Sequence, residues 1–227
     1  MLLYETLRFV KYGARIVNCN YATSRYFNRM TQFRRRIGRP RSAAASAHDA
    51  IIAAVYELLQ TVSVQDLTIE GIARHAGVGK PTLYKWWGTK ADIVLAMVKE
   101  RIEPTLDPPA DLSLEASVQF KARRLVDAFN GFFGRVMAGL IGEAQHNADL
   151  QIRINQAYIL PRRAETIADI RKAQSDGTFP AEIDPEIIVD QVFGSLYFHL
   201  LTGVHPLTHA YADQLVETVF SQARRKA

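Results

Sequence analysis

Residues His75–Asp92 read HAGVGKPTLYKWWGTKAD, which puts a Gly-Lys pair, two adjacent tryptophans and a tyrosine in one short stretch. A Gly-Lys pair can belong to a loop that cradles nucleotide phosphates, with the pattern G-x-x-x-x-G-K-[ST]. Aligned on Lys80, that pattern meets Arg74 where its first glycine belongs and Pro81 where a hydroxyl must hold Mg²⁺. The stretch therefore lacks the chemistry of a phosphate loop.

Two short helices are predicted on either side of Gly77-Val78-Gly79. The first begins after Thr68, a residue type that caps helix N-termini, and ends at Gly77, which suits the position after a helix. The second begins at Lys80 and tolerates Pro81 in its first turn. Each helix is too short to be stable alone and has a narrow apolar face. Two such helices joined by a tight turn predict a helix-turn-helix motif.

The second helix of this motif type enters the major groove of DNA, where its N-terminal residues meet base edges. Lys80 can donate to guanine O6 and N7, and Thr82 offers a methyl and a hydroxyl to base edges. Tyr84 and Lys85 can reach phosphates, which position a helix without reading sequence. Packing alone accounts for Trp87 but leaves these four side chains unexplained.

Helices that would position the motif lie on both sides of it. Ile51, Val55 and Leu58 fall on one apolar stripe at helical spacing before it. Thr89 is expected to cap a helix over about residues 90–103 after it. The prolines that follow mark a domain boundary.

The remainder of the chain also reads as helices, and no convincing strand pair is present. Helices are expected at about residues 113–129, 132–146, 149–175, 185–203 and 208–224. Pro161 lies inside the third and is expected to kink it, because proline lacks the N–H that a helix needs. The predicted fold is therefore all-α. Its parts are residues 1–33 as an extension, 34–45 as a basic arm, 46–103 as a three-helix helix-turn-helix domain and 104–227 as a helical domain.

The segment LTIEGIARHAGVGKPTLYKWWGTKADIVLAMV resembles the DNA-binding half of TetR-type transcriptional regulators. The resemblance covers about residues 46–98 and is specific, because it fixes residue types at many spaced positions. The matching positions are Thr68, Ile72-Ala73, Ala76-Gly77-Val78, Thr82-Leu83-Tyr84, Trp87 and Lys90. Gly79 stands where serine is common, and Trp86 where histidine is common. Residues 104–227 resemble the family only in being helical and of suitable length.

The resemblance implies a homodimer on a palindromic double-stranded DNA operator. It implies a recognition helix over Lys80–Trp86, so that Pro81 and Trp86 join the DNA-binding candidates, and phosphate contacts from Tyr84 and Lys90. Lys90 is also expected at a helix N-terminus, where backbone N–H groups attract phosphate. Thr68 is either a further phosphate contact or a helix cap only.

Positive charge is concentrated near the N-terminus. Residues 1–47 hold ten Lys/Arg and one acid, a net charge of +9, whereas the whole chain carries +5. The candidates for DNA contact in this arm are Arg36, Arg39 and Arg41. Two interpretations stay open: an arm that enters the minor groove, or a solvated basic tail with non-specific attraction to DNA.

Residues 1–33 show no sustained helical period. They are interpreted as a disordered extension, or as residues upstream of a start at Met30. The single Cys19 excludes an internal disulfide, and no apolar run reaches the roughly 18 residues of a membrane span. A cytoplasmic protein without membrane contact is expected.

Enzyme and metal chemistry find no support in the sequence. The six histidines are scattered, and the three near Pro206 have neither cysteine nor HExxH spacing beside them. No G-x-S-x-G, Rossmann fingerprint or paired carboxylates are present. We expect no catalytic residue, no metal and no cofactor.

The helical domain is rich in Phe and Tyr, which at helical spacing more often form a core. In the family this domain encloses an effector pocket, for which the polar candidates are His146, Asn155, Tyr158 and His199. The resemblance also assigns dimerisation to the last two helices, with apolar faces from Val189, Val192, Phe193, Leu196, Leu215, Val219 and Phe220.

The function expected from the sequence is a sequence-specific transcriptional regulator, a repressor released by a small apolar or amphipathic ligand. The alternative is a ligand-independent DNA-organising protein. The salt dependence of binding and the preference for operator over random DNA distinguish the two.

Overall fold

The computed structural model describes residues 41–103 and 106–225, and every element in them is helical. The predicted extension and the arm residues Arg36 and Arg39 lie outside this part of the chain. The elements are α2 (Arg41–Leu58), α3 (Ile69–His75), α4 (Lys80–Tyr84), α5 (Lys90–Met97), η1 (Val98–Ile102), α6 (Leu114–Phe129), α7 (Phe132–Ala144), α8 (Ala148–Ile154), η2 (Asn155–Ile159), α9 (Leu160–Ser175), α10 (Pro185–Val189), η3 (Asp190–Gly194), α11 (Ser195–Thr202) and α12 (His209–Arg225). The three η elements are π-helical segments.

The helix-turn-helix forms where its capping residues predict it. Thr68 precedes α3 and accepts a hydrogen bond from the Gly71 N–H at 3.0 Å. Gly77 follows α3 with φ +65°, a conformation that glycine adopts without strain. Pro81 lies in the first turn of α4, and Thr89 forms a capping box with Asp92 at the start of α5.

The helix before the motif starts earlier than the arm prediction allows. Residues 34–45 were expected to be an arm, but α2 begins at Arg41. The segment after Pro40 is rich in alanine, the strongest helix former, and contains no glycine or proline until the helix ends. The last residues of the predicted arm are therefore the first turn of α2.

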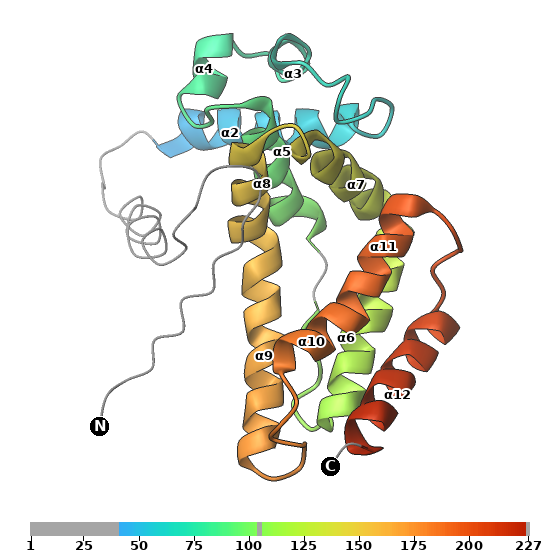
Figure 1. The fold of residues 1–227 in the computed structure, drawn as a ribbon. Helices are drawn as coiled ribbons and strands as arrows, with labels where there is room; N and C mark the ends of the chain where they lie inside the picture. Colours follow the sequence, from blue (N-terminus) through green and yellow to red (C-terminus); the bar gives the residue numbers. More distant parts are fainter. Residues whose placement is uncertain (1–40, 104–105, 226–227) are drawn as a thin grey trace. The chain divides into compact units, whose positions relative to one another are not determined.

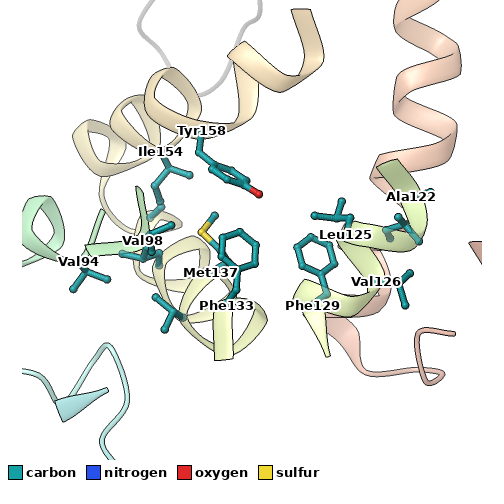
Figure 2. Close-up of a cluster of buried hydrophobic side chains, with 14 of the residues drawn as sticks. Val94, Val98, Ala122, Leu125, Val126, Phe129, Phe133, Met137, Ile154 and Tyr158 are labelled. Carbon is teal, nitrogen blue, oxygen red and sulfur yellow. The ribbon is translucent and has the colours of Figure 1, made fainter. Parts of the chain in front are cut away.

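The later helices follow the predicted segments closely. α6 and α12 lie side by side (Figure 1). Arg123 of α6 binds Asp213 of α12 at 2.6 Å. The core between the neighbouring helices contains Leu125, Phe129 and Phe133 (Figure 2). The continuous helices expected over 149–175 and 185–203 each contain a π-helical segment.

Pro161 shows why one of these interruptions occurs. The sequence predicts a kinked helix here, whereas the chain forms η2 and then begins α9 with Pro161 in its first turn. The Leu160 N–H donates to the Asn155 carbonyl, five residues back. A widened turn accommodates a residue that cannot donate.

The helix-turn-helix and the later helices belong to one compact unit, residues 45–227. The side-chain amide of Gln65 donates to the Gly139 carbonyl of α7 at 3.0 Å, which joins the turn before α3 to the bundle. The domain boundary at residue 104 stays a prediction. No helix in the described ranges is both long and apolar enough to cross a membrane.

Candidate DNA-binding surface and ligand cavity

One face of α4 is exposed and polar. Lys80, Pro81 and Lys85 are exposed, and Tyr84 keeps 56% of its surface accessible. Thr82 is half-buried, and Leu83 is fully buried in the core. The buried leucine fixes the helix, so that the opposite face can meet a partner.

Lys80 already has an anionic partner on the same motif. Its ammonium donates to the carboxylate of Glu70 in α3. This hydrogen bond raises the pKa of Lys80 and lowers the pKa of Glu70. Both side chains are exposed, so a guanine edge or a phosphate can compete with Glu70 for the ammonium.

Trp86 and Trp87 anchor the end of α4 to α2. The ring of His48 lies 5.1 Å from that of Trp87 and 5.7 Å from that of Trp86. Both tryptophans are half-buried and pack against the core. Packing is therefore an observed role of Trp86, and its contact with DNA stays a prediction.

Lys90 faces protein oxygens rather than a phosphate. Its ammonium donates to the Val64 carbonyl at 2.8 Å and to the Gln65 carbonyl at 3.1 Å. Glu143 of α7 lies 3.8 Å away, and only 20% of the Lys90 side chain is exposed. Protein oxygens therefore surround this ammonium, and its contact with a phosphate stays a prediction. The N-terminus of α5 still offers backbone N–H groups.

Thr68 and Arg41 are the remaining candidates for DNA contact in the described chain, and their contact with DNA stays a prediction. Thr68 is exposed and caps α3, so its hydroxyl has the capping role that was one of its two expected roles. Arg41 is the first residue of α2.

A cavity opens between α6, η2, α9 and η3. About 50 Å³ of it is accessible to the centre of a water molecule, and all the space between its walls, open solvent included, is about 510 Å³. The lining includes Lys121, Leu125, Tyr158, Arg162, Phe193 and Tyr197. A second, more polar hollow shares Leu106, Tyr158, Arg162 and Glu165 with it, so the two are adjoining parts of one site.

Tyr158 is a buried polar group that lines this cavity. Only 4% of it is exposed, and its hydroxyl has no hydrogen-bond partner among the described residues. Its ring lies 5.4 Å from the ring of Phe133, and the Arg162 guanidinium lies over it at 4.5 Å. Burial raises the pKa of Tyr158, which keeps the hydroxyl protonated and able to donate. In Figure 2 the hydroxyl points toward Leu125 and Phe129.

Three of the four predicted ligand contacts are not part of this site. His146 is exposed after α7, and Asn155 lines neither part of the cavity. His199 packs instead against Tyr211 of α12, with ring centroids 4.6 Å apart. His199 lines neither part of the cavity, whereas Phe193 and Tyr197 line its inner part.

Arg162, Lys121 and Tyr197 line the cavity but were not expected there from the sequence. Arg162 follows Tyr158 by four residues, a spacing that places two side chains on one helix face. That spacing was a usable signal. Lys121 comes from a distant helix, and nothing local indicates that it lies at the cavity.

The predicted dimer face also needs correction. Val189, Val192, Leu196, Val219 and Phe220 are buried within the chain and cannot meet a partner. The exposed large apolar side chains on or next to α10 and α11 are Ile187, Phe198, Leu201 and Val204. Ile187, Phe198 and Leu201 belong to one of the two predicted helical segments but were not among its predicted dimer contacts, and Val204 follows that segment.

The described residues contain no group of three His, Cys, Asp or Glu able to hold a metal ion.

Both halves of this chain are similar in sequence to known protein families. Residues 51–97 match the family "Bacterial regulatory proteins, tetR family", and residues 108–219 match the "Tetracyclin repressor-like, C-terminal domain". The HTH-type transcriptional regulator YdeS of Bacillus subtilis is 28% identical over 183 residues, which cover 81% of this chain and 91% of YdeS.

Solved structures agree with these matches. The TetR family transcription regulator SCO0332 is 31% identical, with a TM-score of 0.62 over 77% of this chain and 97% of that one. The regulator FadR of Bacillus subtilis, solved in complex with stearoyl-CoA, shares the fold at 17% identity and a TM-score of 0.58, over 78% of this chain and 97% of FadR. The chain therefore belongs to the TetR family of helix-turn-helix transcriptional regulators and binds DNA.

Proposed function

We propose that this protein is a repressor that binds a palindromic operator as a homodimer and is released by a small apolar or amphipathic ligand. The observation that supports release by a ligand is the buried Tyr158 hydroxyl. Tyr158 lines the cavity, and its hydroxyl has no hydrogen-bond partner among the described residues. Buried polar groups are almost always satisfied, so one left open at a cavity favours a ligand that satisfies it.

The DNA-binding part of the proposal uses the exposed face of α4. Lys80 and Thr82 stand in its first turn and read base edges, while Tyr84 and Lys85 contact phosphates. The basic residues before α2 add attraction to the DNA backbone, which depends on salt.

The homodimer part uses the apolar face of α10 and α11. Phe198 and Leu201 are about half exposed, although large apolar side chains favour burial. No atom lies within 4 Å of the position that a Gly194 Cβ would take, so this face is open to a partner helix. A two-fold axis through it would pair each face with its copy.

A short path links the cavity to the recognition helix. η2, which holds Tyr158, continues α8 directly. Arg153 in the last turn of α8 pairs with Asp92, which belongs to the capping box at the start of α5. A ligand that shifts η2 would move α8 against α5 and so change the position of α4. The fold neighbour FadR, whose structure contains stearoyl-CoA, supports ligand binding by this architecture.

The experiment begins with selection of a binding site from random duplexes by the purified protein. We expect a palindrome whose half-site centres are about 34–36 Å apart, or a multiple of that distance. Ligands found by thermal shift are then titrated into the complex. Each tenfold loss of operator affinity requires about 1.4 kcal/mol of coupling. Ligands that stabilise the protein without changing operator affinity would favour the ligand-independent DNA-organising alternative.

A further inference from the structure

We infer that the cavity takes an uncharged, largely apolar ligand with one hydrogen-bond acceptor, such as a carbonyl oxygen, which accepts from the Tyr158 hydroxyl. The inference deepens the proposed function, because it takes the cavity as the effector site. It specifies the chemistry of the ligand from the groups that line the site.

The first argument is the Tyr158 hydroxyl itself. It is buried, protonated and without a partner in the described chain. A buried donor left unsatisfied destabilises a protein, whereas phenylalanine would fill the same space without this cost. A residue that lowers stability at a cavity is expected where binding requires it. The acceptor that would satisfy it has to come from the ligand.

The second argument is the charge balance of the inner cavity. Lys121 binds Asp169 at 2.7 Å and is itself only 6% exposed. Arg162 binds Glu103 at 2.8 Å. Arg163 pairs with Glu186 of α10 and with Asp190 of η3. Each cation already has a carboxylate, so an anionic ligand would have to displace one of them.

The second, more polar hollow also disfavours an anionic ligand. It is lined by Lys99 and Arg162 on the positive side. Glu103, Asp107 and Glu165 line it on the negative side and outnumber the cations. A carboxylate or phosphate head would meet repulsion here. An ammonium group carried into the apolar interior would be desolvated, which is costly.

The third argument is the way the backbone surrounds the site. All three π-helical segments contribute to its lining: η1 through Lys99, η2 through Ala157, Tyr158 and Ile159, and η3 through Phe193. Single π-helical turns inside α-helices are frequent at functional sites. The apolar side chains Leu125, Ile159 and Phe193 would receive the hydrocarbon body while its acceptor meets Tyr158.

The test compares three probes that share a ten-carbon body: 2-decanone, decanoate and decylammonium. Binding to the full chain without DNA is measured by calorimetry at neutral pH. The variants are Tyr158→Phe and, as a matched control, Tyr211→Phe, because Tyr211 lines neither part of the cavity. We expect wild-type protein to bind 2-decanone about tenfold or more tightly than either ion. One neutral hydrogen bond implies about fivefold weaker binding of 2-decanone by Tyr158→Phe, and unchanged binding by the control.

A second measurement separates a ligand role from a purely structural one. Without ligand, Tyr158→Phe should melt about 2–4 °C above the wild type, because the unsatisfied hydroxyl is gone. A structural tyrosine would instead lose stability on this change. The signature of the inference is a gain in melting temperature together with a loss of ketone affinity.

Three results would overturn the inference: tighter binding of decanoate or decylammonium, equal binding of 2-decanone by Tyr158→Phe, or no binding by uncharged ketones of six to twelve carbons. Operator binding is read separately. If decanoate binds and releases the operator, the proposed function stands and this inference fails. If 2-decanone binds through Tyr158 and leaves operator affinity unchanged, this inference stands and release by ligand fails.

Discussion

Nε of Arg153 in α8 lies 2.9 Å from Oδ1 of Asp92 in α5. The pair lacks the alignment of a hydrogen bond, so it acts through charge. The other oxygen of Asp92 accepts hydrogen bonds from the backbone N–H and the hydroxyl of Thr89. One carboxylate therefore joins the start of the helix that follows α4 to the helix that leads into the cavity.

Lys80 is predicted to read a base. Lys80→Ala should cost about 1–3 kcal/mol of operator binding and relax the preference at one position in each half-site. Binding to a panel of single-base operator variants, measured by fluorescence anisotropy, checks this. Lys85→Ala is the comparison, because the loss of a phosphate contact weakens binding to all sequences alike. An unchanged base preference for Lys80→Ala would show that Lys80 contacts only the backbone of the DNA.

Lys90 is predicted to stabilise the fold. Lys90→Met keeps the hydrocarbon stem but removes the donors to the Val64 and Gln65 carbonyls. The free energy of unfolding should fall by about 1–3 kcal/mol, because partly buried carbonyls lose a charged partner. Chemical denaturation measures it, with Lys85→Met as the exposed control. If Lys90→Met keeps its stability and weakens all DNA equally, the phosphate role expected from the resemblance is correct.

Local and distant features of the sequence differ in what they predict. Thr68, Gly77 and Thr89 were assigned correctly, because helix caps depend on residues within one turn. The partner of Lys90 was missed, because the Val64 carbonyl comes from a turn 26 residues earlier in the chain. Only the packing of α5 on that turn brings the two together.

The cavity shows the same limit. Tyr158 was a candidate because it is one of the few polar groups in an aromatic-rich helical domain, and it lines the cavity. His199 was also a candidate but does not line the cavity, because helix periodicity gives the faces of α11 but not which face meets α12 and which meets the cavity. That choice depends on how α6, α9 and α12 pack together.

The exposed face of α10 and α11 is predicted to hold the dimer together. Phe198→Asp should give a monomer, since it puts a charge on an apolar surface that is 54% exposed in the single chain. Analytical ultracentrifugation measures the molecular mass. Ile152→Asp, at an exposed apolar residue of α8, should leave the dimer intact. A dimeric Phe198→Asp variant would place the interface elsewhere.

The N-terminal residues are predicted to be dispensable up to the basic arm. A chain that begins at Met30 should keep its melting temperature and its operator affinity. Further removal of residues 34–40 should lower the affinity and flatten its dependence on salt, because basic contacts to phosphates are lost. Misfolding of the chain that begins at Met30 would show that residues 1–29 are structural.

Coupling of ligand and operator through α8 and α5 can be measured, because each must change the affinity for the other by the same factor. The operator affinity is measured with and without saturating ligand, and the ligand affinity with and without saturating operator. The two affinity ratios must be equal, and we expect a ratio above about ten. Arg153→Met should bring both ratios toward one while each ligand still binds alone, and exposed Arg171→Met should not. Ratios of one in the wild-type protein would show that ligand and operator binding are not coupled.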